Sequence, residues 1–374
     1  MIKDLMENFS TLEDPRCAAK VEHRLIDILV IAVCAVLAGA ESFEDIALYG
    51  RCKQQWLRRF VELPGGIPSH DTFRRVLMLI DPDAFERCFL GWVRAVFDQG
   101  QAAGRQIAIE GKTVRRSFDR RQGRSALHLV SAFATESGVV LMQRATAEQA
   151  GELSALPAVL EGLNLKGCLV SLDALGCQRT TAEEIVGRGG EYLLTLKANQ
   201  GTIYQEVQSW FAAHAFARGA TLRPRLDEFD DGHGRLVRRR VFVCRNVKQF
   251  KTLAGWPAIH TLLATETIRS VNGTGQTTAE IRHYLCSSQA PPKLLALAIR
   301  KHWAIENGLH WVLDVGFGED QSRVRERAAA RNLALLRRIA LNIARADISS
   351  KGSLKAKRKR AAWDDPFMAK LVGS

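Results

Sequence analysis

The hydrophobic pattern of the chain changes at Gln106, and this change constrains the fold more than any other feature. From Leu25 to about Gly100 the apolar residues recur at helical spacing, which predicts an α-helical N-terminal unit. After Gln106, short runs rich in β-branched and apolar residues follow one another, separated by polar or glycine turns. The sequence therefore predicts a helical region followed by a region built on a sheet.

The runs after Gln106 predict a mixed α/β sheet. IAIEG, LHLVSAFA and GVVLMQRAT have the composition of three successive strands. The helical stretch ELSALPAVLEGL then leads to the strand CLVSLD, and the helical stretch TTAEEIVGRG leads to YLLTLK. Strands that alternate with helices after an antiparallel meander are typical of a mixed sheet.

These patterns predict a division of the chain into three parts. Residues 1–100 form an α-helical N-terminal domain, in which Ser69 is expected to cap a helix beginning at His70. Residues 101–345 form the sheet-based core, with a β-rich insertion at about 202–289 and a helix from Pro292 onward. Residues 346–374 form a basic C-terminal tail, which we expect to be mobile when alone.

The positive charge of the chain is unevenly placed. The formal net charge is +13, and the segment from Arg323 to Ser374 holds 14 Lys and Arg against four acids, a net +10. Such a surface attracts polyanions, and nucleic acid, anionic membrane and ribosome all qualify on charge alone. The charge gives a class of partner rather than a function.

Other features of composition favour a cytoplasmic protein. The eight cysteines are scattered without a Cys-x-x-Cys pair, so we expect reduced, buried thiols rather than zinc ligands or disulfides. The opening residues MIKDLMENFSTLEDPR do not resemble an export signal. The apolar run Leu25–Ala40 carries Asp27 and is shorter than the roughly 20 residues of a membrane span, so no membrane association is expected.

Two carboxylates occupy similar positions in predicted apolar strands. Glu110 lies in IAIEGK and Asp173 lies in VSLDALG. Burying an acid in a strand costs free energy unless the acid has a partner, and a metal ion is one such partner. The alternative is that the two acids are structural and form ion pairs with Lys112 or Arg179.

A third acid, Glu306, lies in HWAIENGLHWVLD, where helical spacing places it on one face with His302 and His310. A zinc site is disfavoured, because the metalloprotease motif needs two histidines one turn apart with the glutamate beside the first. Two acids on strands and one on a helix instead form an oxygen-rich site that suits Mg²⁺ or Mn²⁺, with two ions expected.

Long ordered stretches of the chain resemble a known family. They are DPR at residues 14–16, LAGAESFEDIA, GIPSHDTFRRV, IAIEGKTVRRS, HLVSAFA, LKGCLVSLDALGCQ, YLLTLKANQ, DGHGRLVRR and IRKHWAIENGLHWVLDVGFGED. With these stretches, nearly the whole chain is similar to the insertion-sequence DDE transposases of the H-repeat-associated (ISAs) family.

The resemblance implies both a fold and an activity. It implies an RNase H-like core with a β insertion between the second and third acids, in which Glu110, Asp173 and Glu306 are catalytic and bind the metal. It implies an enzyme that recognises the terminal inverted repeats of its element, nicks strand ends and joins the freed 3′-hydroxyl to target DNA. The expected partners are double-stranded DNA, as transposon ends and as target, and a second copy of the chain on that DNA. The expected location is the bacterial cytoplasm, at the nucleoid.

The chain departs from the family pattern at two positions. The first acid is normally Asp, and Glu110 is longer by one C–C bond of roughly 1.5 Å. Val237 stands in HGRLVRR where an acid is expected. The first departure leaves open a catalytically impaired or repurposed DNA-binding protein of the same fold, and a nuclease without strand transfer is a third alternative.

The sequence also predicts side chains that contact DNA. Several follow the strand-end acids or lie in the insertion and on the helix before Glu306, where solvated turns are the alternative. They are Lys112, Arg115, Arg116, Lys197, Asn199, Gln200, His233, Arg235, Arg300 and His302. The run KAKRKR at residues 355–360 is a further candidate for backbone contact.

Overall fold

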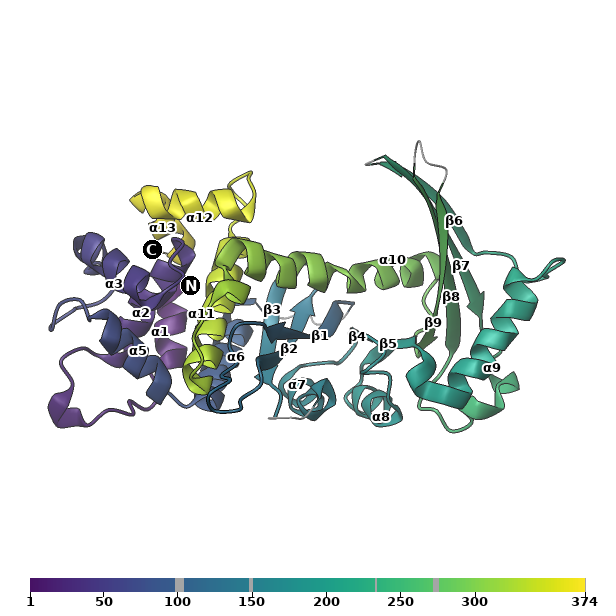
Figure 1. The fold of residues 1–374 in the computed structure, drawn as a ribbon, viewed down its shortest axis with the longest axis horizontal. Coiled ribbons are helices and arrows are strands. Elements are labelled where there is room, and N and C mark those ends of the chain that lie inside the picture. Colours follow the sequence, from purple (N-terminus) through teal and green to yellow (C-terminus); the bar gives the residue numbers. More distant parts are fainter. Residues whose placement is uncertain (98–103, 148–150, 233, 272–275, 374) are drawn as a thin grey trace. The chain divides into compact units, whose positions relative to one another are not determined.

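The computed structural model of the chain describes residues 1–97, 104–147, 151–232, 234–271 and 276–373 (Figure 1). The chain divides into two compact units. Unit 1 comprises Met1–Gln101, Gly111–Ala155 and Glu306–Ser374, and unit 2 comprises Ala102–Glu110 and Leu156–Ile305. None of the described helices is long and apolar enough to cross a membrane.

Unit 1 begins with helices, as the spacing predicts. They are α1 (Ile2–Phe9), α2 (Leu25–Leu37), α3 (Phe43–Cys52), α4 (Gln54–Leu57), α5 (His70–Leu79) and α6 (Pro82–Phe97). Ser69 caps α5 by accepting a hydrogen bond from the backbone N–H of Thr72, which confirms the predicted helix start. Ser42 and Asp45 form a capping box at the start of α3.

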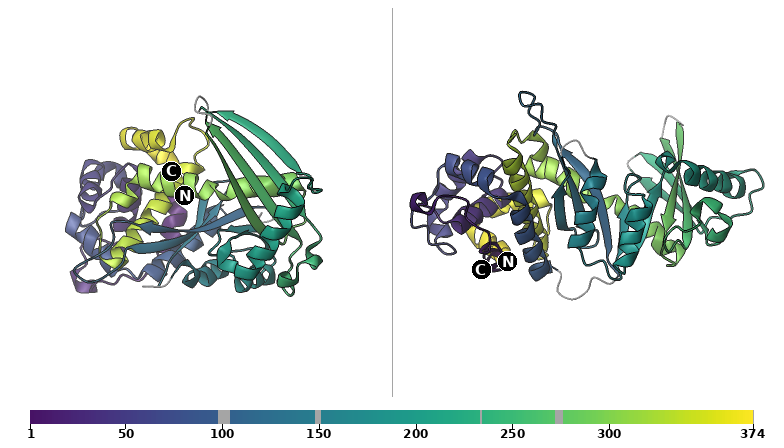
Figure 2. Two further views of the ribbon diagram at one scale, coloured as in Figure 1. Left: turned by 45° about the vertical axis from the view of Figure 1, so that its right-hand side comes forward. Right: turned by 90° about the horizontal axis from the view of Figure 1, so that it is seen from below.

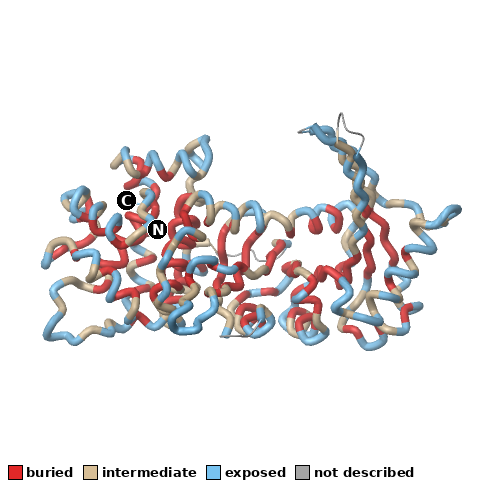
Figure 3. Tube along the Cα trace, viewed as in Figure 1, coloured by how far each residue is buried: buried red, intermediate tan, exposed pale blue. Residues whose placement is uncertain are grey.

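The central element of unit 1 is α11 (Arg327–Ala346), a helix of 20 residues that is buried along most of its length (Figure 3). It packs against α2, α5 and α6 and also against β2 (Leu127–Ala134) and β3 (Val139–Ala145). The N-terminal helices, predicted as a domain of their own, therefore share a core with a helix from the far end of the chain.

The C-terminal segment, predicted as a basic tail, is folded against the rest of unit 1. It forms α12 (Leu354–Trp363) and α13 (Asp365–Val372), and α11 contacts both helices. The apolar side chains Phe367, Met368, Leu371 and Val372 of α13 are buried. Their burial supplies the stabilisation that a basic run alone lacks.

The strands of unit 1 are β3, β2 and the second half of β1 (Gln106–Val114), in the hydrogen-bonded order β3-β2-β1. Strands β2 and β3 are antiparallel, with a register shift between Ala132 and Phe133. In unit 2 the order is β1-β4-β5-β9-β8-β7-β6. These strands are β4 (Leu169–Leu172), β5 (Glu191–Leu196), β6 (Leu226–Gly232), β7 (Arg235–Cys244), β8 (Thr261–Val271) and β9 (Thr277–Cys286).

The sheet of unit 2 is mixed, as predicted. Strands β1, β4 and β5 run parallel, and each pair from β5 through β9 to β6 is antiparallel. The helices α7 (Leu156–Gly162) and α8 (Arg179–Gly187) precede β4 and β5. The predicted β-rich insertion contains α9 (Gly201–Phe211) followed by the long strands β6–β9, which lie side by side in Figure 2.

Helices cover both faces of the β5–β9 part of the sheet. On one face, Leu193, Val243, Leu263 and Tyr284 pack against α10 (Pro292–His302). On the other face, His283 packs against the ring of Phe211 in α9. Adjacent residues such as His283 and Tyr284 point to opposite sides of a strand, which explains why β9 is buried on both faces at this end.

Candidate functional site

The first two predicted acids lie at the same level of two neighbouring parallel strands in unit 2. Ile109 of β1 is the register partner of Leu172 of β4. Glu110 and Asp173 are the next residues along each strand, and both side chains are half-buried. Because partners in register point to the same face of a sheet, the two carboxylates lie on the same face, with Glu110 inside β1 and Asp173 directly after the last residue of β4.

The turn after β4 fixes the Asp173 carboxylate. Its Oδ1 accepts hydrogen bonds from the backbone N–H groups of Leu175, at 3.0 Å, and Gly176, at 3.3 Å. Asn199 and Gln200, in the turn after β5, donate their side-chain N–H groups to the carbonyls of Ala174, at 2.7 Å, and Cys177, at 2.6 Å. The two turns therefore hold each other, and these amides support the loop beside Asp173.

A buried polar group joins α10 to the strand face that carries Asp173. Ser171 lies two residues before Asp173 and therefore points to the same face. Its Oγ is 3.0 Å from Gln106 Nε2 and 3.1 Å from His302 Nδ1. Gln106 also donates to the carbonyl of Ala298 in α10, at 2.8 Å. Burial lowers the pKa of His302 to about 4, so the imidazole is neutral near pH 7.

Glu306 begins an irregular helical segment in unit 1. The stretches Glu306–His310 and Val312–Gly316 are π-helical, a rare conformation that occurs frequently at functional sites. Glu306 is exposed, and so is Trp311, at 60%. In the described part of the chain, no group of three or more His, Cys, Asp or Glu is placed to hold a metal.

Lys112 is the centre of a buried ionic cluster in unit 1. Its Nζ lies 2.6 Å from Asp314 Oδ1, 3.0 Å from Asp320 Oδ1 and 3.4 Å from Glu319 Oε2. Burial alone would lower the pKa of Lys112, but these carboxylates outweigh it and raise that pKa. Glu319 is fully buried and also forms an ion pair with Arg338 of α11. The cluster fixes the segment that follows Glu306 onto β1.

Some of the side chains predicted to contact DNA are exposed, and others are buried and hydrogen-bonded within the protein. Exposed cations are Arg115, Arg116, Lys197, Arg235 and Arg300, although Arg115 and Arg300 also lie near Asp320 and Glu228. His233 lies outside the described residues. The structure does not support a direct phosphate contact for Lys112 or His302, because both are buried and hydrogen-bonded within the protein.

Three arginines of β7, Arg238, Arg239 and Arg240, form ion pairs with acids of neighbouring strands. Arg238 forms two hydrogen bonds with Asp227, at 2.8 and 2.6 Å. Arg240 Nε is 2.5 Å from Glu266 Oε2, and Arg239 Nη1 is 3.4 Å from Asp230 Oδ2. The basic run RLVRRR therefore carries much less net charge in the folded sheet than its sequence indicates.

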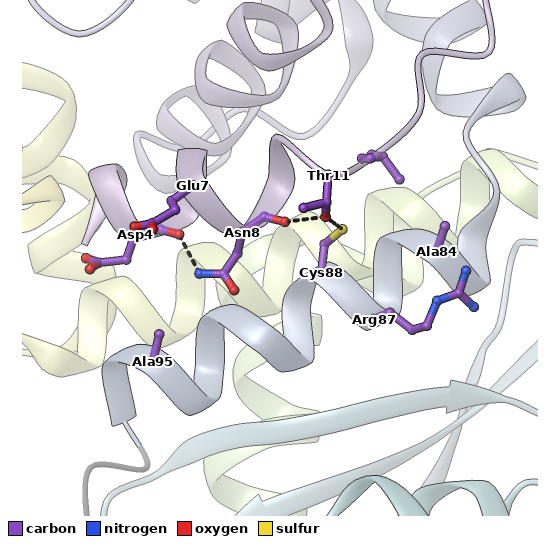
Figure 4. A pocket seen from close by; sticks show the side chains of 9 residues that line it. Asp4, Glu7, Asn8, Thr11, Ala84, Arg87, Cys88 and Ala95 are labelled. Carbon is purple, nitrogen blue, oxygen red and sulfur yellow. Dashed lines mark hydrogen bonds between the residues drawn. The ribbon is translucent and has the colours of Figure 1, made fainter.

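A pocket of about 520 Å³ lies between α1 and α6 in unit 1 (Figure 4). In Figure 4, Thr11 points toward Cys88, whose Sγ is 3.7 Å from the threonine Oγ1. Asn8 donates to the carbonyl of Asp4, at 2.7 Å. None of the residues predicted for catalysis or DNA contact lines this pocket.

Comparison with known proteins identifies the family of this chain. Residues 78–343 match the model of the transposase DDE domain, and residues 6–93 match the model of the DDE_Tnp_1-associated domain. The chain belongs to the DDE transposase family. The family suggested by the sequence motifs is thereby confirmed.

Relatives of this chain cover almost its whole length. YhhI of Escherichia coli (strain K12), named an H repeat-associated transposase, is 35% identical over 99% of this chain and 98% of its own. YncI of Escherichia coli O157:H7 is named a transposase and is 36% identical over 100% of this chain and 95% of its own. A piggyBac transposase synaptic complex with hairpin DNA aligns with a TM-score of 0.41 at 11% identity, covering 100% of this chain and 79% of that one.

Sequence reasoning missed the acids that surround Lys112. Asp314, Glu319 and Asp320 follow Glu306 closely in VLDVGFGED, and Glu319 is fully buried. The signal in the sequence was a group of acids next to apolar residues, together with a single lysine within an apolar strand. Such a pattern indicates a buried ion pair, because charges of this kind are rarely buried without partners.

Proposed function

We propose that this chain binds the inverted-repeat ends of its insertion sequence and catalyses metal-dependent strand cleavage and strand transfer. The observation that carries the proposal is the register of β1 and β4, which presents Glu110 and Asp173 together on one face of the sheet. Catalysis of phosphodiester chemistry needs such preorganised groups at the scissile phosphate.

The side chains present fit a divalent metal. Two carboxylates on neighbouring strands supply the hard oxygen ligands that Mg²⁺ and Mn²⁺ prefer. We propose Glu110, Asp173 and Glu306 as the residues that hold the metal, with Glu306 assigned from its place in the family motif. Two bound ions would supply activation of the attacking water or 3′-hydroxyl and stabilisation of the leaving oxygen.

The remaining groups of the site act by positioning. The backbone N–H groups of Leu175 and Gly176 keep the Asp173 carboxylate in one orientation. The bonds from Asn199 and Gln200 prevent that turn from opening. Exposed Arg116 and Lys197 are proposed to bind phosphates of the DNA, and two copies of the chain are proposed to act on two element ends.

The strand order supports an RNase H-like core within this proposal. Glu110 lies in β1 and Asp173 directly follows β4, two of the parallel strands, and the β6–β9 insertion lies between the second and third acids in sequence. This order of parts agrees with the one that the family resemblance implies.

The test is a cleavage and strand-transfer assay with a labelled duplex that carries the element's own ends, in Mg²⁺ and in Mn²⁺. We expect Asp173→Asn to abolish product, since it removes the charge and keeps the side-chain shape. Glu183→Gln, an exposed acid on α8 of the same unit, is the matched control and should leave product formation unchanged. Equal activity of Asp173→Asn and the unaltered chain would contradict the proposed site.

A second candidate function follows from Glu110. Its extra C–C bond, roughly 1.5 Å, is a large displacement for a site whose metal ions lie about 3.5 to 4 Å apart. The second candidate is therefore a DNA-binding protein with impaired catalysis. Glu110→Asp separates the two functions, because it should raise the product yield of a weak enzyme. A duplex that is bound but not cut, even by Glu110→Asp, would favour the non-catalytic function.

A further inference from the structure

The basic run at the C-terminus folds as a helix whose cations face two directions. Lys357 of α12 donates to the carbonyls of Ala344 and Asp347. Arg358 donates to the carbonyl of Val36, at 2.8 Å, and its guanidinium lies 3.8 Å from the centre of the Phe317 ring. These two cations anchor α12 to the body of unit 1 and are not available to an external ligand.

The opposite face of α12 is exposed and cationic. Lys355, Lys359 and Trp363 follow one another at a spacing of four residues, which places them along one side of a helix. Both lysines are exposed, and the Trp363 side chain is 77% exposed. Arg360, on the neighbouring row, is compensated by Asp364, at 3.0 Å, and lies over the ring of Phe367.

The anchoring makes this face a rigid surface. Ser353 caps α12 by accepting from the N–H of Ala356, and Asp364 caps α13 directly after it. Lys53 pairs with Asp365 at 2.6 Å, which fixes the junction of the two helices to the N-terminal part of unit 1. The lysines are therefore presented at a fixed spacing rather than on a mobile tail.

We infer that the Lys355, Lys359 and Trp363 face of α12, the α12 face, is a docking surface for the backbone of duplex DNA. The segment 351–363 contains several Lys and Arg and no acid, so its charge complements a polyanion. An anionic membrane fits less well, because interfacial helices need a free apolar face and the inner side of α12 is already packed. Ammonium groups would contact phosphates, and the indole would contact deoxyribose.

This inference rests on the proposed DNA-binding function and adds a binding surface to it. Such a surface contributes affinity and orientation without reading sequence, because phosphate contacts carry no base information. The α12 face would therefore hold flanking or target DNA as readily as the element's own ends.

The test measures the salt dependence of duplex binding by fluorescence anisotropy, with a duplex of unrelated sequence as the probe. Each phosphate contact contributes roughly 0.9 to the slope of log K against log salt. We expect Lys355→Gln with Lys359→Gln to make this slope shallower by about 2. Lys3→Gln with Lys20→Gln removes the same charge from exposed lysines of unit 1 and should leave the slope unchanged. Trp363→Ala should weaken binding without changing the slope.

The outcomes separate this inference from the proposed function. An unchanged slope in the Lys355 and Lys359 double variant, with normal folding by circular dichroism, would overturn the role of the α12 face alone. Duplex binding that depends on the α12 face, with no cleavage product, would leave this inference standing and contradict the catalytic proposal. Binding of phosphatidylserine vesicles in preference to duplex would overturn the inference in favour of a membrane surface.

Discussion

Lys112 Nζ lies 2.6 Å from Asp314 Oδ1, and this contact joins β1 to the segment that follows Glu306. Both residues belong to unit 1. Lys112 is two residues after Glu110 on the same strand, and Asp314 lies in the second π-helical stretch. The ammonium group thus determines where the Glu306-bearing segment lies along β1. Lys112, which the sequence predicts to bind DNA, is therefore engaged within the protein by carboxylates that follow Glu306.

Replacing Lys112 should destabilise the protein strongly. Lys112→Met leaves three carboxylates near each other without their shared cation, and breaking a buried pair costs about 3 to 5 kcal/mol. Urea denaturation gives the change in the free energy of unfolding. Arg115→Gln, which alters a side chain that is 81% exposed beside the same Asp320, should change it by less than about 1 kcal/mol.

The same variant distinguishes positioning from phosphate contact. At a temperature where Lys112→Met remains folded, its DNA affinity should show an unchanged salt slope, while the Mg²⁺ concentration needed for cleavage should rise. A slope shallower by about 1 would instead mean that Lys112 binds a phosphate.

The low pKa of Glu319 predicts that the free energy of unfolding falls over a specific range of acidic pH. Burial would raise its pKa, but Arg338 and Lys112 lower it to about 2 from an ordinary value of 4.5. A carboxyl group whose pKa is lower in the folded protein than in the unfolded chain stabilises the fold at pH values above its pKa in the unfolded chain. This stabilisation is lost as the pH falls through the pKa of the group in the folded protein. We expect a loss on the order of 3 kcal/mol between about pH 4.5 and pH 2.

The measurement for Glu319 is the free energy of unfolding at a series of pH values. Glu319→Gln should be less stable at pH 7 and should show a flatter pH profile in that window. Glu183→Gln, which removes an exposed acid, serves as the control and should follow the unaltered chain. Identical pH profiles for Glu319→Gln and the unaltered chain would disprove the assignment.

The low pKa of His302 predicts a second effect of pH on the free energy of unfolding. His302 contacts the strand face that carries Asp173. Because burial lowers its pKa to about 4, the folded state disfavours the imidazolium relative to the unfolded chain, whose histidine titrates near 6.5. Stability from the neutral imidazole is therefore present above about pH 6.5 and lost as the pH falls toward 4. His302→Leu should flatten the profile in this window.

His302→Leu should also separate support of the site from DNA contact. Loss of the bond to Ser171 loosens the end of α10, so cleavage should fall while the salt slope of DNA binding stays the same. Ser171→Ala removes the same bond from the other partner and should reproduce the loss of cleavage. A lower salt slope in His302→Leu with normal cleavage would restore the direct DNA contact predicted from the sequence.

How much of the fold could be predicted depends on how far apart in the sequence the interacting residues lie. The period of apolar residues located α5 with its Ser69 cap, the strand that contains Glu110 and the strand that directly precedes Asp173, because these signals are local. The partners of Lys112 lie far along the chain, and no periodicity links them. The exposure of individual cations also depends on tertiary packing, which is why Arg358 and Lys359 have different surroundings although they are neighbours.

The close packing around Gly111, the residue after Glu110 in β1, predicts that a larger side chain at this position destabilises the protein. A Cβ at this position would clash with Glu152 Oε1 and with His128 Nε2. These two atoms lie 2.9 Å apart in a hydrogen bond, and His128 Nδ1 is 2.8 Å from Thr113 Oγ1. Gly111→Ala should therefore displace the Glu152 side chain and lower the free energy of unfolding by roughly 1 to 3 kcal/mol.

The substitution Glu152→Ala provides the control for this prediction, because it removes the side chain that the new Cβ would contact. On its own it should cost about 1 kcal/mol, the usual contribution of one hydrogen bond. Combined with Gly111→Ala it removes the clashing carboxylate, so the double variant should be more stable than the sum of the two single changes predicts. Strictly additive losses in urea denaturation would show that the close packing of Glu152 over Gly111 does not limit the residue at position 111.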